Sequence, residues 1–239
     1  MGTQLIAMGG GGFMMEPDNP LLDEYILAQA PSRCPRVLFL PTAQGDSHDA
    51  IARFYNAFER FACVPTILSV FRPFGRPDNF ETAILASDVV YVAGGATRAM
   101  IAVWRAYGIH LALRKAWERG VVLAGLSAGA LCWFEEGHTD STPGGLSKMD
   151  CLGFLKGSFS CHFDGDPKRR PSYAQLIVGG HIRPGYAVDD GVALHFVDGE
   201  FSCAVSSRPN VGARFFSVES GALREVPLTV KYLKADSQG

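Results

Sequence analysis

The stretch Val121-Val122-Leu123-Ala124-Gly125-Leu126-Ser127-Ala128-Gly129-Ala130 decides the fold expected of this chain. It opens with a short apolar run, typical of a buried strand, and continues into the pattern G-x-S-x-G. A strand–turn–helix unit of this kind exposes the serine hydroxyl at the carboxyl edge of a sheet. The glycines permit the tight turn, and N–H groups at the helix start face a developing oxyanion. We therefore predict that Ser127 is a nucleophile; a glycine-rich turn with a capping serine is the alternative.

The rest of the chain repeats the same alternation of apolar runs and helical patterns. The apolar runs are Leu5–Met8, Val37–Leu40, Thr66–Val70 and Val89–Ala93, and the helical patterns lie at 20–29, 47–61, 80–86 and 98–119, with a break at Gly108. Strands that lack strict alternation and are separated by helices predict a mostly parallel sheet buried on both faces. Beyond residue 185, short apolar runs separated by turns such as Asp198-Gly199 predict a C-terminal β meander at the sheet edge. We expect a single α/β domain over residues 1–239.

Composition and charge exclude several classes of protein. The 239 residues carry a formal net charge of −2, and the longest basic run, Lys168–Arg170, is too short for a nucleic-acid footprint. No apolar stretch reaches the length of a membrane span, and the N-terminus does not match a signal peptide. The six cysteines show no CxxC spacing, so we expect reduced thiols, a cytoplasmic location, and no metal or cofactor.

A serine nucleophile needs a base, and the base needs an orienting acid. His162 ends the half-apolar run 157–161 and precedes a polar turn, which places it at a strand end on the edge that carries the nucleophile. His138 is the alternative base. The acids between Ser127 and His162 are Glu135, Glu136, Asp140 and Asp150. The pair Gly94-Gly95 ends the preceding strand, and its position suits a second oxyanion donor.

Three segments together resemble peptidase family S51, the group of dipeptidase E and cyanophycinase. They are Val90–Thr97, Gly125–Ala130 and Cys161–Asp164. The resemblance implies a flavodoxin-like sheet related to the class I glutamine amidotransferases, with serine in place of their cysteine. It implies a Ser127–His162 pair and oxyanion N–H groups from Gly95 and Ala128, beside Gly94.

The resemblance also implies an acid and a substrate-binding arginine. Asp140 matches the aspartate of dipeptidase E, and Glu136 matches the glutamate of cyanophycinase-like members. Arg170 matches an arginine that binds the acidic side chain of the substrate, although Pro171 follows it here. Two further departures are Ala96, where the family has asparagine, and Cys161, where it has proline.

The function expected from these residues is a serine peptidase that hydrolyses small peptides, with a preference for N-terminal Asp left open. The alternatives are an α/β-hydrolase-type esterase and a non-catalytic, amidotransferase-like binding module. The esterase is less favoured because only 35 positions separate Ser127 from His162. The expected partner is a small peptide, with neither nucleic acid nor membrane, and a homodimer is one of the open oligomeric states.

Overall fold

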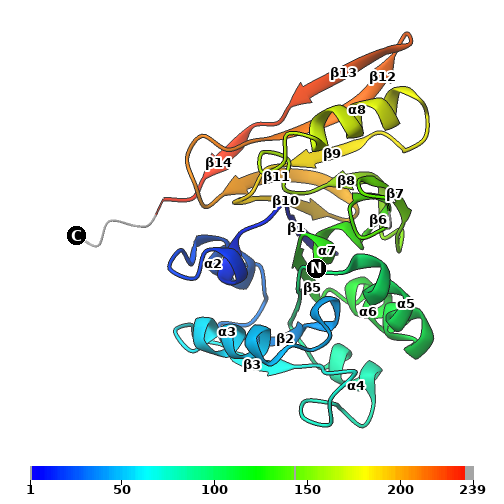
Figure 1. Ribbon diagram of the computed structural model, residues 1–239. Helices are drawn as coiled ribbons and strands as arrows, with labels where there is room; N and C mark the ends of the chain where they lie inside the picture. The colour runs from blue at the N-terminus through cyan, green and yellow to red at the C-terminus, as the bar shows by residue number, and fades with distance from the viewer. Residues whose placement is uncertain (1, 143, 235–239) are drawn as a thin grey trace.

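Two β-sheets form the frame of the molecule, and helices pack around them (Figure 1). The structure is a computed structural model that describes residues 2–142 and 144–234. Within those residues the first sheet has eight strands: β1 (Gln4–Met8), β2 (Arg36–Leu40), β3 (Val64–Ile67), β4 (Val89–Val92), β5 (Val122–Leu126), β10 (Val192–Val197), β11 (Glu200–Ser206) and β14 (Val230–Tyr232). The second has six: β6 (Phe134–Thr139), β7 (Ser147–Asp150), β8 (Leu155–Ser160), β9 (Gly185–Val188), β12 (Ala213–Glu219) and β13 (Ala222–Pro227).

The first sheet is parallel from β1 to β3 and mixed on the other side of β1, where the edge strand β14 pairs in parallel with β11. Its strand order is β14-β11-β10-β1-β5-β4-β2-β3, and the neighbours from β1 to β3 all pair in parallel. Every residue of β4 and β5 is buried, as expected for parallel strands covered on both faces. The predicted α/β fold with a mostly parallel sheet flanked by helices is therefore confirmed. On the other side of β1, β10 and β11 continue the sheet in antiparallel fashion.

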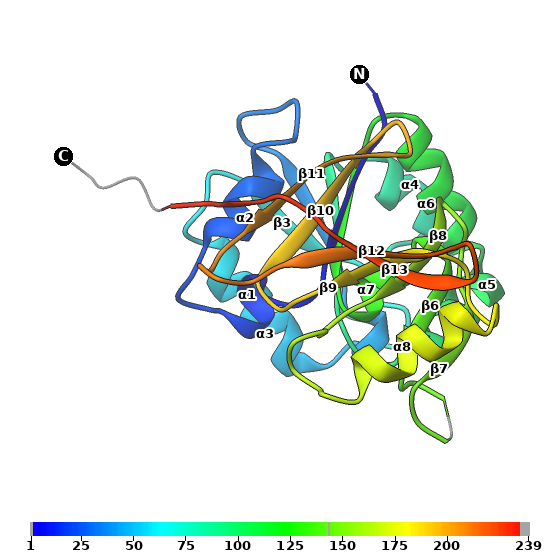
Figure 2. The ribbon, with the colours of Figure 1, turned by 90° about the horizontal axis from the view of Figure 1, so that it is seen from above.

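The helices that follow the parallel strands lie on both faces of the first sheet (Figure 2). They are α1 (Gly12–Met15), α2 (Leu21–Leu27), α3 (His48–Phe58), α4 (Phe80–Leu85), α5 (Thr97–Tyr107), α6 (Ile109–Glu118) and the short α7 (Ala128–Leu131), with a 3₁₀ turn, η1, at Thr42–Gln44. Successive residues of β1 divide between two cores. Leu5 packs in the cluster that contains Trp104 of α5, and Ile6 packs in the cluster that contains Phe54 of α3. Gly108 adopts φ 71° and separates α5 from α6, where the sequence predicted the break.

The second sheet differs from the expected meander. Strands do form at the expected C-terminal runs, but they divide between the two sheets: β10 and β11 extend the first, whereas β9, β12 and β13 join the second. The second sheet has the order β13-β12-β9-β8-β6-β7 and carries α8 (Arg169–Val178) (Figure 1).

The helix after Ser127 is also shorter than expected. The sequence predicts a helix from Ala128 to Phe134, but α7 ends at Leu131 and β6 begins at Phe134. Phe134 stacks on Phe159 of β8, with ring centroids 4.9 Å apart, and β6 pairs with both β7 and β8. Pairing and aromatic burial therefore outweigh the local helical pattern.

The two sheets meet at the carboxyl end of β1. The N–H of Ser127, just after β5, donates to the carbonyl of Met8 at 3.1 Å, and the N–H of His162, just after β8, donates to the carbonyl of Gly9 at 3.3 Å. Strands from different sheets thus bring the predicted nucleophile and the predicted base to the same edge. Among the residues described, none of the helices has the length and apolar character needed to cross a membrane.

Candidate active site

Ser127 occupies a strained backbone position between β5 and α7. Its φ is 52° and its ψ is −115°, a combination that costs an L-residue about 1–3 kcal/mol. The neighbouring glycines allow the strain, because a Cβ on Gly125 would lie 2.3 Å from the carbonyl oxygen of Gly129, and a Cβ on Gly129 would lie 2.4 Å from that of Val92. The turn therefore has the geometry that the G-x-S-x-G pattern predicts, with the serine presented above the sheet edge.

The hydroxyl of Ser127 lies next to a thiol. Its Oγ is 3.7 Å from Sγ of Cys161, and no other hydrogen-bonding contact of this Oγ occurs among the described residues. Cys161 is buried, and burial raises the pKa of its thiol, so the sulfur is a neutral neighbour at pH 7. Among the described residues, no hydrogen bond joins Ser127 to His162; catalytic hydrogen bonds of this kind often form only in the complex with substrate.

His162 is held by an aspartate that follows it in the chain. Its Nδ1 lies 2.5 Å from Oδ1 of Asp190, and the two side chains are 25% and 18% exposed. Asp190 is itself positioned by its backbone N–H, which donates to Asp164 at 2.9 Å. A carboxylate on Nδ1 fixes that proton and leaves Nε2 to accept another, which is the state a general base needs.

Neither acid expected from the sequence lies at His162. Glu136 accepts a hydrogen bond from the backbone N–H of Arg183 at 2.6 Å and forms an ion pair with Lys148 at 3.0 Å. Asp140 is paired instead with Arg169, at 3.3 Å. Glu136 is thus paired with a lysine of β7 and Asp140 with an arginine of α8, so the structure brings neither carboxylate to the imidazole.

Asp190 lies outside the interval between Ser127 and His162 in which the sequence places the candidate acids. One feature of the sequence does point to it. Asp190 follows the apolar run Tyr186–Val188, which forms β9, and β9 pairs in parallel with β8. Since parallel neighbours end at the same edge, an acid just beyond β9 lies beside a histidine just beyond β8.

His138, the alternative base, has a structural role. It is fully buried, with Nδ1 2.9 Å from Oγ of Ser160 and Nε2 3.0 Å from Oγ of Ser172, and it stacks on Tyr173. Burial, with a smaller contribution from the nearby positive charge of Arg169, lowers its pKa to about 4. Both ring nitrogens are thus occupied, and His138 links β8 to α8 rather than serving Ser127.

The loop after β4 lies against the serine turn. A Cβ on Gly94 would lie 3.2 Å from Cβ of Ser127. Gly95 adopts φ 138°, and a Cβ there would lie 2.4 Å from the carbonyl oxygen of Ala43, so both its conformation and its surroundings require glycine. The N–H of Gly95 and that of Ala128, at the start of α7, donate to no acceptor in the described residues. Both expected oxyanion donors are thus free to bind a ligand.

The two arginines at the start of α8 have opposite surroundings. Arg170 is 58% exposed and pairs with Glu225 of β13 at 2.6 Å. Arg169 is only 6% exposed, and its single partner among the described residues is Asp140; its Nε and Nη1 are buried without hydrogen bonds. Arg169 is close enough to Cys161 to oppose the effect of burial on the pKa of that thiol. Arg169 is thus a buried guanidinium with two unpaired nitrogens, close to the residue that contacts Ser127.

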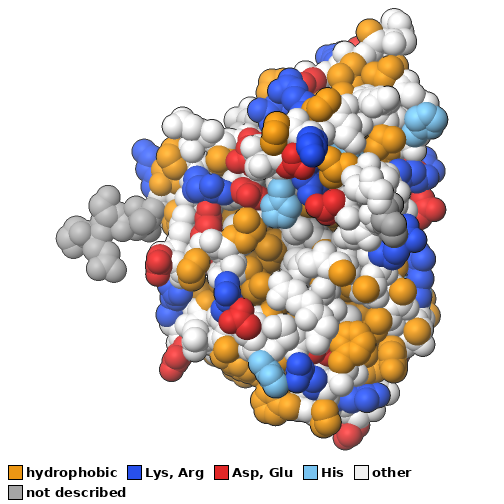
Figure 3. Space-filling view, in the orientation of Figure 1, with side chains coloured by type: hydrophobic (Ala, Val, Ile, Leu, Met, Phe, Trp, Pro, Cys, Tyr) orange, Lys and Arg blue, Asp and Glu red, His pale blue; other side chains and the backbone are white. Residues whose placement is uncertain are grey.

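The loop that carries Asp140 also borders the site. Oγ of Ser141 accepts a hydrogen bond from the backbone N–H of Thr97 at 3.3 Å, just beyond the Gly94-Gly95 pair. This contact places Asp140 and its partner Arg169 on the side of the site that the oxyanion loop forms. Figure 3 shows a histidine near the centre of this face of the molecule, with acidic and basic side chains around it and hydrophobic surface below it.

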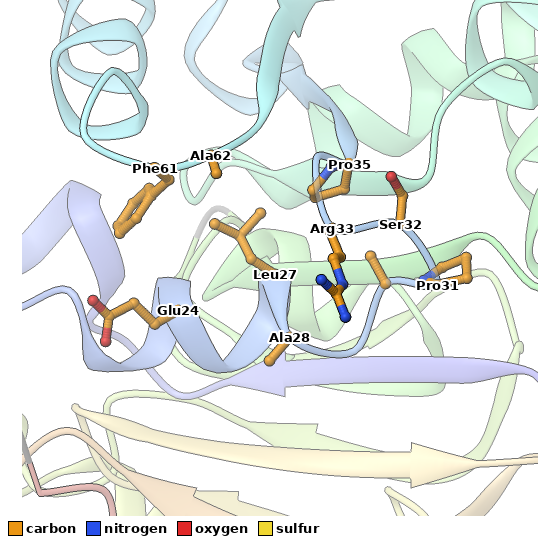
Figure 4. A pocket seen from close by; sticks show the side chains of 10 residues that line it. Glu24, Leu27, Ala28, Pro31, Ser32, Arg33, Pro35, Phe61 and Ala62 are labelled. Carbon is orange, nitrogen blue, oxygen red and sulfur yellow. The ribbon is translucent and has the colours of Figure 1, made fainter. Parts of the chain in front are cut away.

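A cavity away from the serine turn has a volume of about 400 Å³. It lies between α2 and the loops before β2 and β3, with Leu27, Arg33 and Phe61 among its lining residues (Figure 4). None of its lining residues is a predicted site residue, and none contacts Ser127 or His162. The cavity therefore adds nothing to the chemistry of the serine turn.

The fold and the strand-end residues are those of an α/β peptidase. The family model for peptidase family S51 matches residues 5–204. The chain is 50% identical over 230 residues to a Bacillus subtilis (strain 168) protein named uncharacterized peptidase YgaJ, a match that covers 96% of this chain and 99% of that protein. The chain belongs to peptidase family S51, as its motifs suggested.

Solved structures show the same fold. A peptidase from an acI-B1 Actinobacterium superposes with a TM-score of 0.72 at 18% identity, covering 96% of this chain and 95% of that one. A putative peptidase E protein from Listeria monocytogenes EGD-e superposes with a TM-score of 0.60 at 18% identity, covering 84% of this chain and 98% of that one. At this level of identity the likeness concerns the fold alone.

Proposed function

We propose that this peptidase is of the serine type and that Ser127, His162 and Asp190 form its catalytic triad. The observation that carries the proposal is the 2.5 Å contact between Nδ1 of His162 and Asp190, at the same sheet edge as the strained Ser127 turn. In the first step Oγ of Ser127 bonds to the peptide carbonyl carbon while its proton passes to Nε2 of His162. The imidazolium then protonates the leaving amine, and water hydrolyses the acyl-enzyme by the same route.

Backbone N–H groups stabilise the oxyanion of the tetrahedral intermediate. The N–H groups of Gly95 and Ala128 flank Ser127 and lack acceptors of their own in the described structure. A preorganised donor of this kind typically contributes about 10²–10³-fold to kcat. Glycine at 94 lets the two loops approach closely enough for both donors to serve one oxygen.

The substrate proposed is a small peptide, with a preference for an acidic N-terminal side chain. The support comes from Arg169, whose two free, buried nitrogens need an anionic partner. The sequence assigned this role to Arg170, but that guanidinium is exposed and paired with Glu225. We therefore assign recognition of the acidic side chain to Arg169, and the carboxylate of Asp140 occupies its remaining edge.

A serine-directed reagent tests the catalytic assignment. A fluorophosphonate probe should label the wild type at Ser127 and should not label Ser127→Ala. His162→Ala should lose labelling and dipeptide hydrolysis to a similar degree, because the two residues act as one unit. His181→Ala is the matched control, since His181 is exposed beyond α8 and should leave both rates unchanged. Wild-type protein that folds but is neither labelled nor active would favour a binding module instead.

A further inference from the structure

The Gly-rich loop, Gly9–Gly12, connects β1 to α1 and holds both members of the His162–Asp190 pair. The carbonyl of Gly9 accepts the N–H of His162 at 3.3 Å, and the carbonyl of Gly10 accepts the N–H of Gly191, the residue after Asp190, at 3.0 Å. A Cβ on Gly10 would lie 2.0 Å from Oδ1 of Asp190 and 3.0 Å from Nδ1 of His162. The pair therefore packs directly on this backbone, and a shift of the loop moves it.

The far end of the Gly-rich loop is fixed by a buried carboxyl group. Asp23 of α2 is 2% exposed, accepts a hydrogen bond from the hydroxyl of Tyr91 at 3.0 Å, and receives a backbone hydrogen bond from Phe13. Gly12 is pressed against both side chains, because a Cβ there would lie 2.5 Å from the Tyr91 hydroxyl oxygen and 3.1 Å from Oδ1 of Asp23. Asp23 and Tyr91 thus contact the backbone of residues 12 and 13 and hold it in place.

Burying a carboxyl group in a core costs free energy of folding, so its presence there needs a physical reason. No step of the proposed mechanism uses it, and an apolar residue would cover Phe13 at no desolvation cost. What the Asp23 carboxylate supplies is an acceptor for a hydroxyl and a backbone N–H at once, from β4 and α1 respectively. It ties the start of α1 to the sheet, which a methyl group cannot do.

We propose that Asp23, held by Tyr91, is a positioning residue for catalysis: it fixes the Gly-rich loop and, through that loop, the His162–Asp190 pair. The inference rests on the proposed serine mechanism for its effect on rate, but the geometry of the pair can be tested without it. Asp23 touches neither substrate nor Ser127, so its influence passes entirely through the backbone of residues 9–13.

The ionised form of Asp23 accepts the stronger hydrogen bonds and so holds the loop more tightly. The charged groups near it are Glu16, at the end of α1, and Arg60, just beyond α3; Tyr91 is the titratable group from β4. Glu16 is paired with Arg208, and Arg60 donates to the carbonyls of Ala57 and Pro17. Burial, more than any of these groups, raises the pKa of Asp23 to about 7, so the carboxyl group changes charge within the range of an activity assay.

The test compares the wild type with Asp23→Asn, which keeps the shape but cannot ionise. The rate of fluorophosphonate labelling is measured for both proteins from about pH 5.5 to about pH 8.5, on either side of the pKa of Asp23. Since every other pH-dependent group is common to both proteins, the wild-type to variant ratio isolates Asp23. At the high end the variant should be labelled more slowly, on the order of tenfold, and the ratio should approach one at the low end. A ratio that stays constant across this range contradicts the proposal.

A second readout does not depend on reactivity. The proton between Nδ1 of His162 and Asp190 is expected to give a downfield resonance in ¹⁵N-labelled protein, to be assigned by its loss in His162→Gln. That resonance should broaden or shift in Asp23→Asn and in Tyr91→Phe, which retains the carboxyl group but loses the hydroxyl donor. Tyr91→Phe keeps the test available if Asp23→Asn does not fold. Glu24→Gln, the exposed neighbour that lines the cavity in Figure 4, is the matched control and should leave resonance and labelling unchanged.

The outcomes separate the two proposals. A perturbed resonance in a protein whose wild type is never labelled would reject the serine mechanism and retain the positioning role. An unperturbed resonance in both variants would reject the positioning role, whatever the labelling shows.

Discussion

The Nδ1 atom of His162 lies 2.5 Å from the carboxylate of Asp190, across two parallel strands of the second sheet and 28 residues of sequence. His162 follows β8 and Asp190 follows β9, so the pair is a product of strand adjacency rather than of a local motif. The backbone of His162 is also unusual, because its φ of 50° lies in the left-handed region that L-residues seldom adopt. These relationships define which substitutions should affect turnover.

Asp190→Asn should lower kcat by roughly 10³–10⁴-fold with little change in KM, because the amide favours the wrong tautomer of the imidazole. Asp140→Asn and Glu136→Gln should each retain far more activity, since neither carboxylate contacts His162. Steady-state kinetics on the best dipeptide substrate would measure all three. Asp150→Asn, at an exposed position of β7, is the matched control. If Asp140→Asn were the most damaged variant, the dipeptidase E-like acid expected from the sequence would be right and the Asp190 assignment would fail.

The sequence was sufficient to predict the parallel half of the first sheet and the positions of Ser127 and His162. Those predictions rest on local signals: apolar runs that end in glycine, and a serine at a strand end. Tertiary pairing determined the rest. Nothing local indicates that β9 leaves the C-terminal strands to pair with β8, and that pairing is what brings Asp190 to His162.

The substrate-binding arginine illustrates the same limit. Arg169 and Arg170 are adjacent in sequence and chemically identical, and only the packing of α8 against the second sheet distinguishes them. One side chain turns inward beneath the Asp140 loop, and the other reaches Glu225 on β13. A one-residue difference on a helix corresponds to a rotation of about 100°, which no motif match resolves.

Arg169→Met should remove a preference for acidic N-terminal residues, whereas Arg170→Met should leave it intact. A buried, paired charge lost to a neutral group costs about 2–5 kcal/mol, so the ratio of kcat/KM for Asp-initiated over Asn-initiated dipeptides should fall by roughly 30-fold or more. The labelling rate of Ser127 with a small fluorophosphonate should change little in either variant. Equal kcat/KM values for both dipeptides in the wild type would contradict the assignment of Arg169 to the acidic side chain of the substrate.

Gly125→Ala and Gly94→Ala should separate stability from activity at the serine turn. A Cβ on Gly125 meets a backbone carbonyl at 2.3 Å and cannot be relieved by a side-chain rotation, so the free energy of unfolding should fall by several kcal/mol, more than about 3. A Cβ on Gly94 has its closest contact, 3.2 Å, with Cβ of Ser127, so this variant should keep most of its stability and lose turnover. Urea unfolding and kcat measurements on the same preparations would test the contrast. Equal losses of stability in the two variants would indicate that the loop after β4 and the serine turn shift together to accommodate either Cβ.

His138→Gln should change how the free energy of unfolding depends on pH below about pH 6.5. It should not cause the complete loss of labelling expected for His162→Ala. The folded-state pKa of His138, about 4, lies below its ordinary value of 6.5. The unfolded chain therefore binds more protons between these values, and the contribution of His138 to stability is present above pH 6.5 and lost as the pH falls toward 4. The variant should show a shallower loss of stability over that interval, measured by urea unfolding at a series of pH values. An unchanged slope would mean that His138 is not held neutral in the folded protein.

Asp23 should act on stability in the opposite direction to His138. Burial raises its folded-state pKa from 3.8 to about 7, so the folded protein binds the extra proton between those values and the unfolded chain does not. Stability from this group is therefore fully present below about pH 4 and is lost as the pH rises to about 7, with a total of roughly 4 kcal/mol. In the wild type this loss cancels the gain of roughly 3 kcal/mol that His138 provides over nearly the same pH range.

Asp23→Asn should remove this loss. Between about pH 4 and about pH 7 the free energy of unfolding of the variant should therefore rise relative to that of the wild type, and the difference should be largest at the upper end. The asparagine stays neutral and can still accept from Tyr91, so the variant avoids the cost of a buried charge. Urea midpoints for wild type, Asp23→Asn and the control Glu24→Gln would show it, with the control following the wild type. Slower labelling of Ser127 in a variant that is more stable at high pH would separate the positioning role of Asp23 from any general weakening of the fold. Parallel curves for the wild type and Asp23→Asn would instead show that the carboxyl group does not change its charge on folding and that its pKa stays near 3.8.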